Sequence, residues 1–370
     1  MLESYAIWSQ ITEPGDSVGG LLRRTLGVSQ SLEYVNSSIQ PRELLAKIPE
    51  DSFRSDEFVQ HLDDSLECWR RRIKTVEPAR ALEAIYKLDG QLVTPEDLHW
   101  PIYLDDLGDH APAAIWVIGK PESIPMTALS VIGARLASEY GLELTSELVR
   151  FSVSQGWSIV SGGALGIDAA ASSSAIANSG TTVAVMAGGL DRLYPRENIG
   201  LFQKIKESGA LISELAPGVS PSRWRFLQRN RLIAALGQAT LVVEAGFRSG
   251  SINTAFHAND LGRPVGAMPG PVDSVRSAGC HRLIREGRAE LIATPAHLSE
   301  LMGQRVDLDN AGPIRDNKQI RVLDALYGHV LSEEKVAAAA GLTLRETTQT
   351  LHLLAKANLV SKISLGWRKH

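Results

Sequence analysis

The sequence predicts an α/β protein whose core is a parallel sheet covered by helices on both faces. Short apolar runs alternate with helical segments between residues 129 and 295, and this alternation is typical of such sheets. Residues 1–85 show only helical periodicity, and residues 317–370 combine helical segments with a hairpin pattern. We therefore expect a helical domain at 1–85, a sheet domain at 86–303, a linker at 304–316 and a small domain at 317–370.

Length and composition favour a multidomain protein of the cytoplasm. A chain of 370 residues exceeds one ordinary domain, and 44% hydrophobic residues suffice for a buried core. The first residues lack the basic and apolar stretches of a signal peptide, and no apolar run approaches the roughly 20 residues that span a membrane. Cys68 and Cys280 lie far apart, which excludes a disulfide framework and gives no basis for a zinc site.

Charge is unevenly distributed along the chain. Residues 1–110 contain 20 acidic and 11 basic residues, for a net charge of −9. Residues 111–370 contain 22 acidic and 27 basic residues, for a net charge of +5. The overall charge of −4 argues against a protein coated with positive charge, but the later domains can form a local basic groove.

In the first domain, apolar residues recur at helical spacing on either side of a turn at Pro14-Gly15-Asp16. They are Ile7, Ile11, Leu21, Leu22 and Leu26, followed by Phe58, Leu62, Leu66 and Trp69. Residues 90–128 are rich in proline and aspartate, so we expect an irregular connector with one strand, Ala114–Ile118.

The sheet domain contains the predicted strands and helices in strict alternation. The strands are Leu129–Ile132, Ser158–Val160, Thr182–Met186, Leu211–Ser213, Ala239–Val243 and Pro264–Ala267. The helices are Glu139–Gln155, Ala169–Asn178, Glu197–Glu207, Leu232–Leu236, Ile252–Leu261 and Cys280–Glu286. In open parallel sheets, ligands bind outside the carboxyl ends of the strands.

Small, glycine-rich turns follow most of these strands. They include Gly133-Ala134-Arg135, Ser161-Gly162-Gly163, Ala187-Gly188-Gly189, Ser249-Gly250-Ser251 and Pro269-Gly270-Pro271. One such turn is a weak signal, because glycine also serves ordinary tight turns. Five turns at one edge of a sheet predict a row of anion sites, where backbone N–H groups and helix N-termini face the ligand.

An arginine cluster lies beside this edge, and no acidic residue interrupts it. It consists of Arg223, Arg225, Arg229 and Arg231, with Asn230 among them. Arginines next to a row of anion sites favour phosphate as the ligand. Trp224 and Phe226 are interleaved with the cluster, and they either stack on bases or anchor a loop by burial.

The last domain is predicted to be winged-helix-like. A helix is expected over residues 320–327, a second after a Ser332 cap, and a third after Thr343, whose spacing to Glu346 predicts a capping box. A hairpin at residues 359–368 would complete the unit. Few basic residues lie on the third helix, so its expected partner is either DNA or another protein.

The sequence contains no motif typical of a hydrolase or of an ATP-binding phosphate loop. Asp168 and Glu244 are among the carboxylates of the core, and we expect Glu244 to hold an arginine such as Arg229 or Arg231 in position. We predict no catalytic residue, no cofactor and no metal. A line of anion sites suits the backbone of a single-stranded nucleic acid.

These residues resemble the bacterial DNA-processing protein A family (DprA, also called Smf). The resemblance covers about residues 95–295 and rests on motifs in a fixed order. They are Gly133-Ala134-Arg135, Ser161–Ala170, Gly188–Asp191 with Tyr194-Pro195, Phe226 with Arg229-Asn230-Arg231, Glu244-Ala245, Ser249-Gly250-Ser251, Gly262-Arg263, Pro269-Gly270 and Gly279 with Leu283-Ile284.

The resemblance implies an extended Rossmann-like core that binds single-stranded DNA without sequence preference, between a helical (SAM-like) domain and a winged-helix-like domain. It also implies a homodimer without enzymatic activity that loads the RecA recombinase onto DNA covered by single-strand-binding protein during natural transformation. Carried over by position, the DNA contacts are Arg135, Ser161, Gly162, Gly163, Arg229, Asn230, Arg231, Ser249, Gly250 and Ser251.

The chain departs from the family pattern at several positions. Leu165 stands where the family often has arginine, Ser172 where it has histidine, Leu227 where it has proline, and His281 where it has asparagine. The loss of a basic residue at position 165 would weaken or reshape the DNA groove.

Two other classes of protein are alternatives. Phosphoribohydrolases resembling lysine-decarboxylase-like proteins share this type of core and would make the chain a nucleotide-processing enzyme. However, Asp260 is the only acid between Ser249 and Arg263, so their catalytic glutamate is absent. A regulatory protein that senses a small phosphorylated ligand is the third class.

Overall fold

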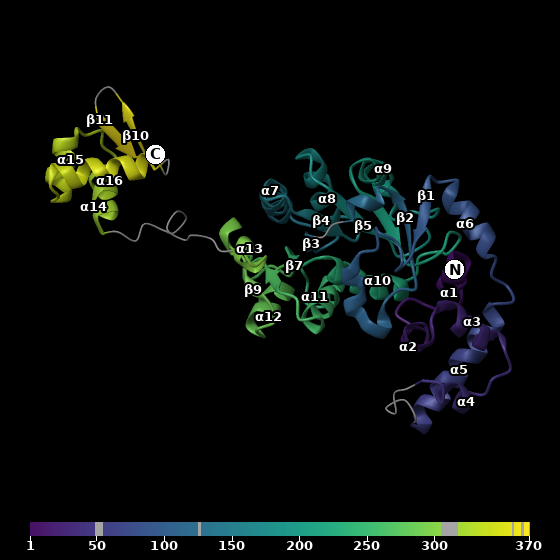
Figure 1. The fold of residues 1–370 in the computed structure, drawn as a ribbon. Coiled ribbons are helices and arrows are strands. Elements are labelled where there is room, and N and C mark those ends of the chain that lie inside the picture. The colour runs from purple at the N-terminus through teal and green to yellow at the C-terminus, as the bar shows by residue number, and fades with distance from the viewer. Residues whose placement is uncertain (49–54, 125–126, 305–316, 357–358, 364–365, 370) are drawn as a thin grey trace. The chain divides into compact units, whose positions relative to one another are not determined.

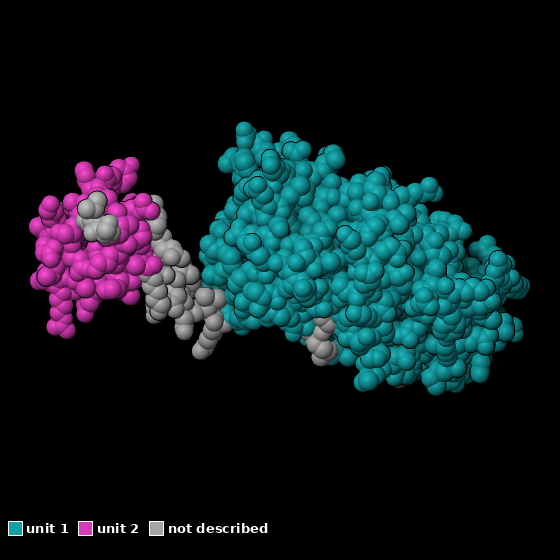
Figure 2. Space-filling model, turned by 90° about the horizontal axis from the view of Figure 1, so that it is seen from above, with its two compact units in different colours: residues 1–304 teal, residues 305–370 magenta. Residues whose placement is uncertain are grey.

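The structure is a computed structural model that describes residues 1–48, 55–124, 127–304, 317–356, 359–363 and 366–369. The chain divides into two compact units, Met1–Gln304 and Arg305–His370, coloured teal and magenta in Figure 2. Of the predicted linker 304–316, residues 305–316 lie outside the described residues. The predicted domain boundary at residue 85 stays a prediction.

The described part of residues 1–86 is helical, as predicted. Its helices are α1 (Leu2–Ile11), α2 (Ser17–Leu26), α3 (Val28–Asn36), α4 (Pro41–Leu45), α5 (Asp56–Arg72) and α6 (Pro78–Tyr86). Asp16 caps α2 at the expected turn, where its carboxylate accepts a hydrogen bond from the Gly19 amide at 2.9 Å. One hydrophobic cluster joins these helices to Leu92 and Trp116 in the sheet, so both share a core.

The described residues form a sheet of nine strands at the centre of the first unit (Figure 1). The strands are β1 (Gly90–Val93), β2 (Ile115–Gly119), β3 (Ala128–Ile132), β4 (Ser158–Ser161), β5 (Thr182–Val185), β6 (Ala210–Ser213), β7 (Ala239–Val242), β8 (Val265–Ala267) and β9 (Glu290–Leu291). Their order across the sheet is β1-β2-β6-β5-β4-β3-β7-β8-β9. All pairs from β6 to β9 are parallel, which confirms the predicted core.

The edge formed by β1 and β2 differs from the expectation. β2 pairs antiparallel with β6, and β1 pairs antiparallel with β2. The prediction of an irregular connector over residues 90–128 was therefore wrong for β1. β1 has only four residues, of which the first two are partly exposed and the last two are buried. So short a segment does not show the alternation of apolar and polar residues by which a strand is predicted.

Helices cover both faces of the parallel sheet, as predicted. One face carries α7 (Glu139–Ser154), α8 (Ile167–Ala177), α9 (Ile199–Ser208) and α13 (Pro295–Leu301). The other face carries α10 (Arg223–Leu236), α11 (Gly250–Asp260) and α12 (Ala278–Arg285). The short 3₁₀ helices are η2 (Ile102–His110), η3 (Pro121–Ser123) and η4 (Arg196–Asn198).

The strand order reverses beside β3. The chain runs from β3 outward through β4 and β5 to β6, and then returns along α10 to β7 on the other side of β3. The connections leaving β3 and β7 therefore diverge over opposite faces of the sheet. Such a topological switch point leaves a crevice at the carboxyl ends of the two strands, where ligands bind in open α/β sheets.

The second unit has its own hydrophobic cluster, which includes Val322, Leu351 and Trp367. Its elements are α14 (Asn317–Ala325), α15 (Glu333–Ala340), α16 (Leu344–Lys356), β10 (Val360–Ile363) and β11 (Gly366–Lys369). The predicted capping box is present, since the Thr343 amide donates to Glu346 at 3.0 Å and the Glu346 amide donates to the Thr343 hydroxyl at 3.3 Å. The order of elements is the one predicted for a winged-helix-like unit.

Candidate functional site

A pocket of about 950 Å³ opens at the switch point and is called here the switch-point pocket. Three segments line it: residues 132–136 after β3, the first three turns of α10, and residues 248–254 at the start of α11. Ala164, Asp168, Tyr194, Pro221 and Ser222 complete the wall. The glycine-rich turns predicted after β3 and β7 thus line one cavity together with Arg223 and Arg229 of the arginine cluster.

The geometry of α10 decides which arginines reach this pocket. The sequence predicts a helix from Leu232, but α10 begins at Arg223, where the Ser222 hydroxyl accepts a hydrogen bond from the Arg225 amide at 3.3 Å. The pocket is lined by residues at helical spacing, namely Arg223, Phe226, Leu227, Arg229, Asn230 and Ile233. Arg225 and Arg231 lie on another side of the helix.

Three exposed arginines face the pocket: Arg135, Arg223 and Arg248. Within the described part of the chain, none of them forms an ion pair or a side-chain hydrogen bond. The Arg135 guanidinium lies over the Phe226 ring, 5.3 Å from its centre. Asp168 is the only acidic residue among the described residues that line the pocket. The pocket is therefore strongly positive.

Arg223 and Arg248 are not among the predicted contact residues. Arg223 belongs to the predicted arginine cluster, and its place one turn before Phe226 identifies it once the helix is known. Arg248 directly precedes the Ser249-Gly250-Ser251 turn. A basic residue beside a predicted anion-binding turn is the sequence signal that could have identified it.

Arg229 lies in the floor of the pocket and is 6% exposed. Its Nη1 atom donates to the carbonyls of Gly162 and Val185, both at 2.7 Å, while its Nε atom has no partner among the described residues. Burial lowers the pKa of the Arg229 guanidinium to about 10, and the Asp168 carboxylate opposes this shift. A buried cation with an unpaired N–H is suited to attract an anion into the pocket.

Asp168 is the buried counterpart of Arg229. Its carboxylate accepts hydrogen bonds from the amides of Gly162 at 3.1 Å and Ala164 at 3.4 Å. Burial raises the pKa of the Asp168 carboxyl, and Arg229 and the backbone amides oppose the rise. Asp168 therefore fixes the turn after β4 and compensates the charge of Arg229.

The predicted turn Ser161-Gly162-Gly163 is buried behind the pocket wall. The Ser161 hydroxyl donates to the Val131 carbonyl at 2.7 Å. A Cβ atom at Gly162 would lie 2.1 Å from Nη1 of Arg229, so only glycine lets the guanidinium approach. Ala164 is the nearby residue that lines the pocket. The DNA contacts predicted for these three residues stay predictions.

The predicted turn Ser249-Gly250-Ser251 lines the pocket directly. Ser249 caps α11, and the hydroxyls of Ser249 and Ser251 lie 2.6 Å apart. The side-chain amide of Asn230 donates from Nδ2 to the Gly250 carbonyl at 3.2 Å, which connects α10 to the start of α11. The N-terminus of α11, which carries the positive end of the helix dipole, thus lies at the cavity.

Arg231 lies outside the pocket and is 4% exposed. Its Nη2 atom donates to the Glu214 carboxylate at 2.7 Å, and its Nε atom donates to the His110 carbonyl at 3.1 Å. The predicted DNA contact at Arg231 stays a prediction, and the side chain is engaged in the core.

The expectation that Glu244 holds Arg229 or Arg231 was wrong. Its carboxylate accepts hydrogen bonds from the Ser138 hydroxyl and from the Ser138 amide, the latter at 2.9 Å. Ser138 also caps α7, so Glu244 fixes the loop that carries Arg135. Sequence alone gives no signal for this pairing, because the two residues meet only through the β3–β7 contact.

The two aromatic residues of the arginine segment differ in environment. Phe226 packs edge to face against Tyr194, with ring centres 5.8 Å apart, and lies beneath Arg135 and Arg229. Trp224 is 56% exposed and does not line the pocket. On a helix, residues two apart point in different directions, which separates the pair.

In the described part of the chain, no group of histidine, cysteine, aspartate and glutamate side chains could hold a metal ion. Cys68 and Cys280 are both free. No helix in the described ranges is both long and apolar enough to cross a membrane.

Comparison with known proteins gives one consistent result. Residues 91–303 match the family model of the DNA recombination-mediator protein A. The putative DNA processing protein DprA of Mycobacterium tuberculosis is 38% identical over 307 residues, which cover 78% of this chain and 79% of that protein. The DNA processing protein DprA of Streptococcus pneumoniae is 35% identical over 226 residues, or 59% of this chain and 79% of the relative.

Two solved structures are similar in fold. The X-ray structure of DprA from Streptococcus pneumoniae has a TM-score of 0.64 and 27% identity, and covers 80% of this chain and 97% of that chain. The structure of DNA processing protein A from Helicobacter pylori has a TM-score of 0.53 and 29% identity, and covers 58% and 98%. The Helicobacter pylori structure is described for its single-stranded DNA binding mode.

Proposed function

The chain belongs to the DprA/Smf family of DNA-processing recombination mediators, and on that premise we propose that it binds single-stranded DNA in the switch-point pocket without sequence preference. One observation carries the proposal. Arg135, Arg223 and Arg248 face a cavity at the switch point without acidic partners among the described residues, and the buried cation Arg229 also lines it.

The chemistry of the pocket suits phosphates. Guanidinium groups pair with phosphate oxygens, and the N-terminus of α11 adds the positive end of a helix dipole. The contacts that we propose from the predicted set are Arg135, Arg229, Asn230, Ser249, Gly250 and Ser251, with Arg223 and Arg248 added. In this proposal the turn Ser161-Gly162-Gly163 has an indirect role, because Gly162 leaves the space that the Arg229 guanidinium occupies.

Contacts of this kind reach the backbone of the strand and not the edges of its bases. Affinity then depends on the number of phosphates held and on the salt concentration. We therefore expect no sequence preference, because the contacts are made to the phosphates and not to the bases. The description of the Helicobacter pylori relative supports a single strand as the ligand.

We further propose the partners that the family resemblance implies. The protein would act as a homodimer in the cytoplasm, load the RecA recombinase onto single strands covered by single-strand-binding protein, and so serve recombination in natural transformation. The family membership supports the mediator role at the level of DNA processing and recombination.

The alternative, a nucleotide-processing enzyme, needs a carboxylate free to act on a substrate in the pocket. Asp168 lines the pocket, but its carboxylate accepts hydrogen bonds from the backbone and faces Arg229. Glu244 is bound to Ser138, and Glu214 is bound to Arg231. Release of base from a nucleoside monophosphate at enzymatic rates would favour this alternative over DNA binding.

The test is the affinity for labelled oligo-dT, measured by fluorescence anisotropy for the wild type and for Arg135→Ala. We expect Arg135→Ala to bind about tenfold more weakly, because an exposed, unpaired guanidinium is lost from the pocket. Mixed-sequence strands of equal length should bind the wild type as oligo-dT does.

Arg150→Ala is the matched control, because Arg150 is an exposed arginine of α7 away from the pocket. It should bind as the wild type does. Equal affinities of Arg135→Ala and Arg150→Ala at the same salt concentration would contradict the placement of DNA in this pocket.

A further inference from the structure

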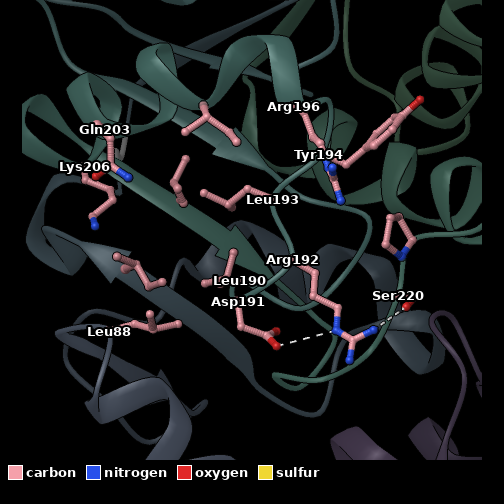
Figure 3. A pocket seen from close by; sticks show the side chains of 14 residues that line it. Leu88, Leu190, Asp191, Arg192, Leu193, Tyr194, Arg196, Gln203, Lys206 and Ser220 are labelled. Atoms are coloured by element: carbon pink, nitrogen blue, oxygen red, sulfur yellow. Dashed lines mark hydrogen bonds and ion pairs between the residues drawn. The ribbon is translucent and has the colours of Figure 1, made fainter.

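A second pocket of about 650 Å³ adjoins the switch-point pocket, and we call it the Lys206 pocket (Figure 3). Tyr194 and Pro221 line both pockets, so the two cavities meet at these residues. The Lys206 pocket extends from there along the 190–196 loop and α9. Tyr194 is 46% exposed at this junction of the two cavities.

The charged groups of the Lys206 pocket are mostly basic. Among the described residues that line it, Arg192, Arg196 and Lys206 are basic and Asp191 is the one acid. Asp191 is partly neutralised, since Arg192 lies 3.7 Å away and the Gly218 amide donates to it at 2.8 Å. Among the described residues, Arg196 and Lys206 have no side-chain partner. The pocket therefore has free cations for a polyanion.

The cations lie on two sides of the cavity. In Figure 3, Lys206 and Gln203 project from α9 on one side, while Arg192 and Arg196 lie opposite them. Arg192 is fixed by a hydrogen bond from its Nη1 atom to the Ser220 hydroxyl at 2.8 Å. A chain passing between these two sides would have donors on both, as a phosphodiester backbone requires.

Apolar side chains form the rest of the lining. Leu88, Ile118, Leu190, Leu193 and Leu211 contribute it, from β2, β6 and the loops beside them. Sugars and bases present apolar surface between the phosphates of a single strand. A lining that combines free cations with aliphatic side chains thus suits a nucleic acid better than a small inorganic anion.

The charge of the neighbouring cavities sets where such a path ends. A third pocket shares Asp191 and Arg192 with the Lys206 pocket. Its lining also contains Arg80 and Glu77, which pair with each other at 2.9 Å. Acids and bases are balanced among the described residues that line it, so it should attract a strand less than the Lys206 pocket does.

We propose that the single strand held in the switch-point pocket continues past Tyr194 into the Lys206 pocket, where Lys206 binds one of its phosphates. This inference rests on the proposed function, because it extends the path of the same ligand. It makes Lys206 important for long strands and unimportant for strands that fill only the switch-point pocket.

The experiment compares oligo-dT of about 5 and about 20 nucleotides, lengths near the lower end and above the upper end of the roughly 4 to 16 nucleotides that an OB-fold domain holds. For Lys206→Ala, affinity for the long strand should fall about 5-fold, and the salt dependence of its log affinity should flatten by about 0.7, the value for one phosphate contact. Affinity for the short strand should not change. Lys206→Arg should retain the long-strand affinity.

Lys204→Ala is the matched control, since Lys204 is an exposed lysine of α9 that does not line the pocket. Thermal unfolding verifies that each variant is folded. If Lys206→Ala binds the long strand as Lys204→Ala does, or loses affinity for both lengths equally, the extended path is wrong. Arg135→Ala separates this failure from failure of the proposed function, because it should weaken both lengths whatever Lys206 does.

Discussion

Arg223, Arg225, Arg229 and Arg231 lie on one helix but have different roles. Arg223 is exposed at the switch-point pocket, and Arg229 lies in its floor. Arg225 pairs with Glu13 at 3.1 Å, and Arg231 pairs with Glu214 at 2.7 Å. Two of the four arginines in the predicted cluster therefore stabilise the fold. Arg231 forms an ion pair within the sheet domain, and Arg225 forms one with the N-terminal helical part.

A substitution of Arg231 tests whether the ion-paired arginines stabilise the fold without binding DNA. Arg231→Met should lower the free energy of unfolding by about 3 kcal/mol, because it leaves the nearly buried Glu214 carboxylate without its cation. Its affinity for oligo-dT should stay that of the wild type, because the side chain does not line the pocket. Chemical denaturation and anisotropy on the same preparation measure the two quantities.

A double variant is the control for Arg231→Met. Glu214→Gln with Arg231→Met should be more stable than Arg231→Met alone, since no unpaired charge then remains buried. A stable Arg231→Met protein with weakened DNA binding would place Arg231 in the interface after all.

At the level of elements, the sequence predicts what local patterns determine. The parallel strands from β3 to β8 and the capping box at Thr343 follow from short-range signals and are present. The start of α10 is not predictable in this way. Residues 229–236 are buried all round, so the helix has no apolar stripe that would reveal its period.

The candidate site shows the same limit. The rim turns after β3 and β7 can be predicted, because carboxyl ends of parallel strands share one edge. Which side chains enter the pocket depends on the phase of α10 and on contacts between distant segments. Glu244 and Ser138 are 106 positions apart in the chain, and only the paired strands bring them together.

Glu346 in the third helix of the second unit is expected to make the stability of that unit depend on pH. Hydrogen bonds from Lys318 and then from Thr343 lower the pKa of the Glu346 carboxyl to about 2. A carboxyl whose folded pKa lies below its unfolded value stabilises the fold above the unfolded pKa, and this contribution is lost as pH falls toward the folded pKa.

We therefore expect the unfolding midpoint of a fragment of residues 305–370 to fall as pH decreases from about 5 to about 2. Glu346→Gln should show a weaker dependence over this range. Glu333, whose pKa is also lowered, by hydrogen bonds from Trp367 and Thr348, remains in the variant and accounts for a residual slope. Identical pH profiles of the two fragments, recorded by circular dichroism, would exclude this role of Glu346.

For the whole molecule, the sheet topology and the distribution of charge act together. The reversal of strand order beside β3 creates the cavity, and the exposed arginines at its rim have no acidic partners among the described residues. Acids of the first 110 residues bind other arginines instead, as in the Glu13–Arg225 and Asp106–Arg263 pairs. The acidic N-terminal part can thus coexist with a basic groove in a chain of net charge −4.

We propose that the switch-point pocket holds the phosphates of a single strand. The most direct measurement is the salt dependence of oligo-dT affinity for the wild type and for the variant Arg135→Ala/Arg223→Ala/Arg248→Ala, with folding verified by thermal unfolding. Three lost phosphate contacts predict weaker binding and a slope of log affinity against log salt that flattens by about 2. An unchanged affinity and an unchanged slope in the folded triple variant would show that DNA binds elsewhere.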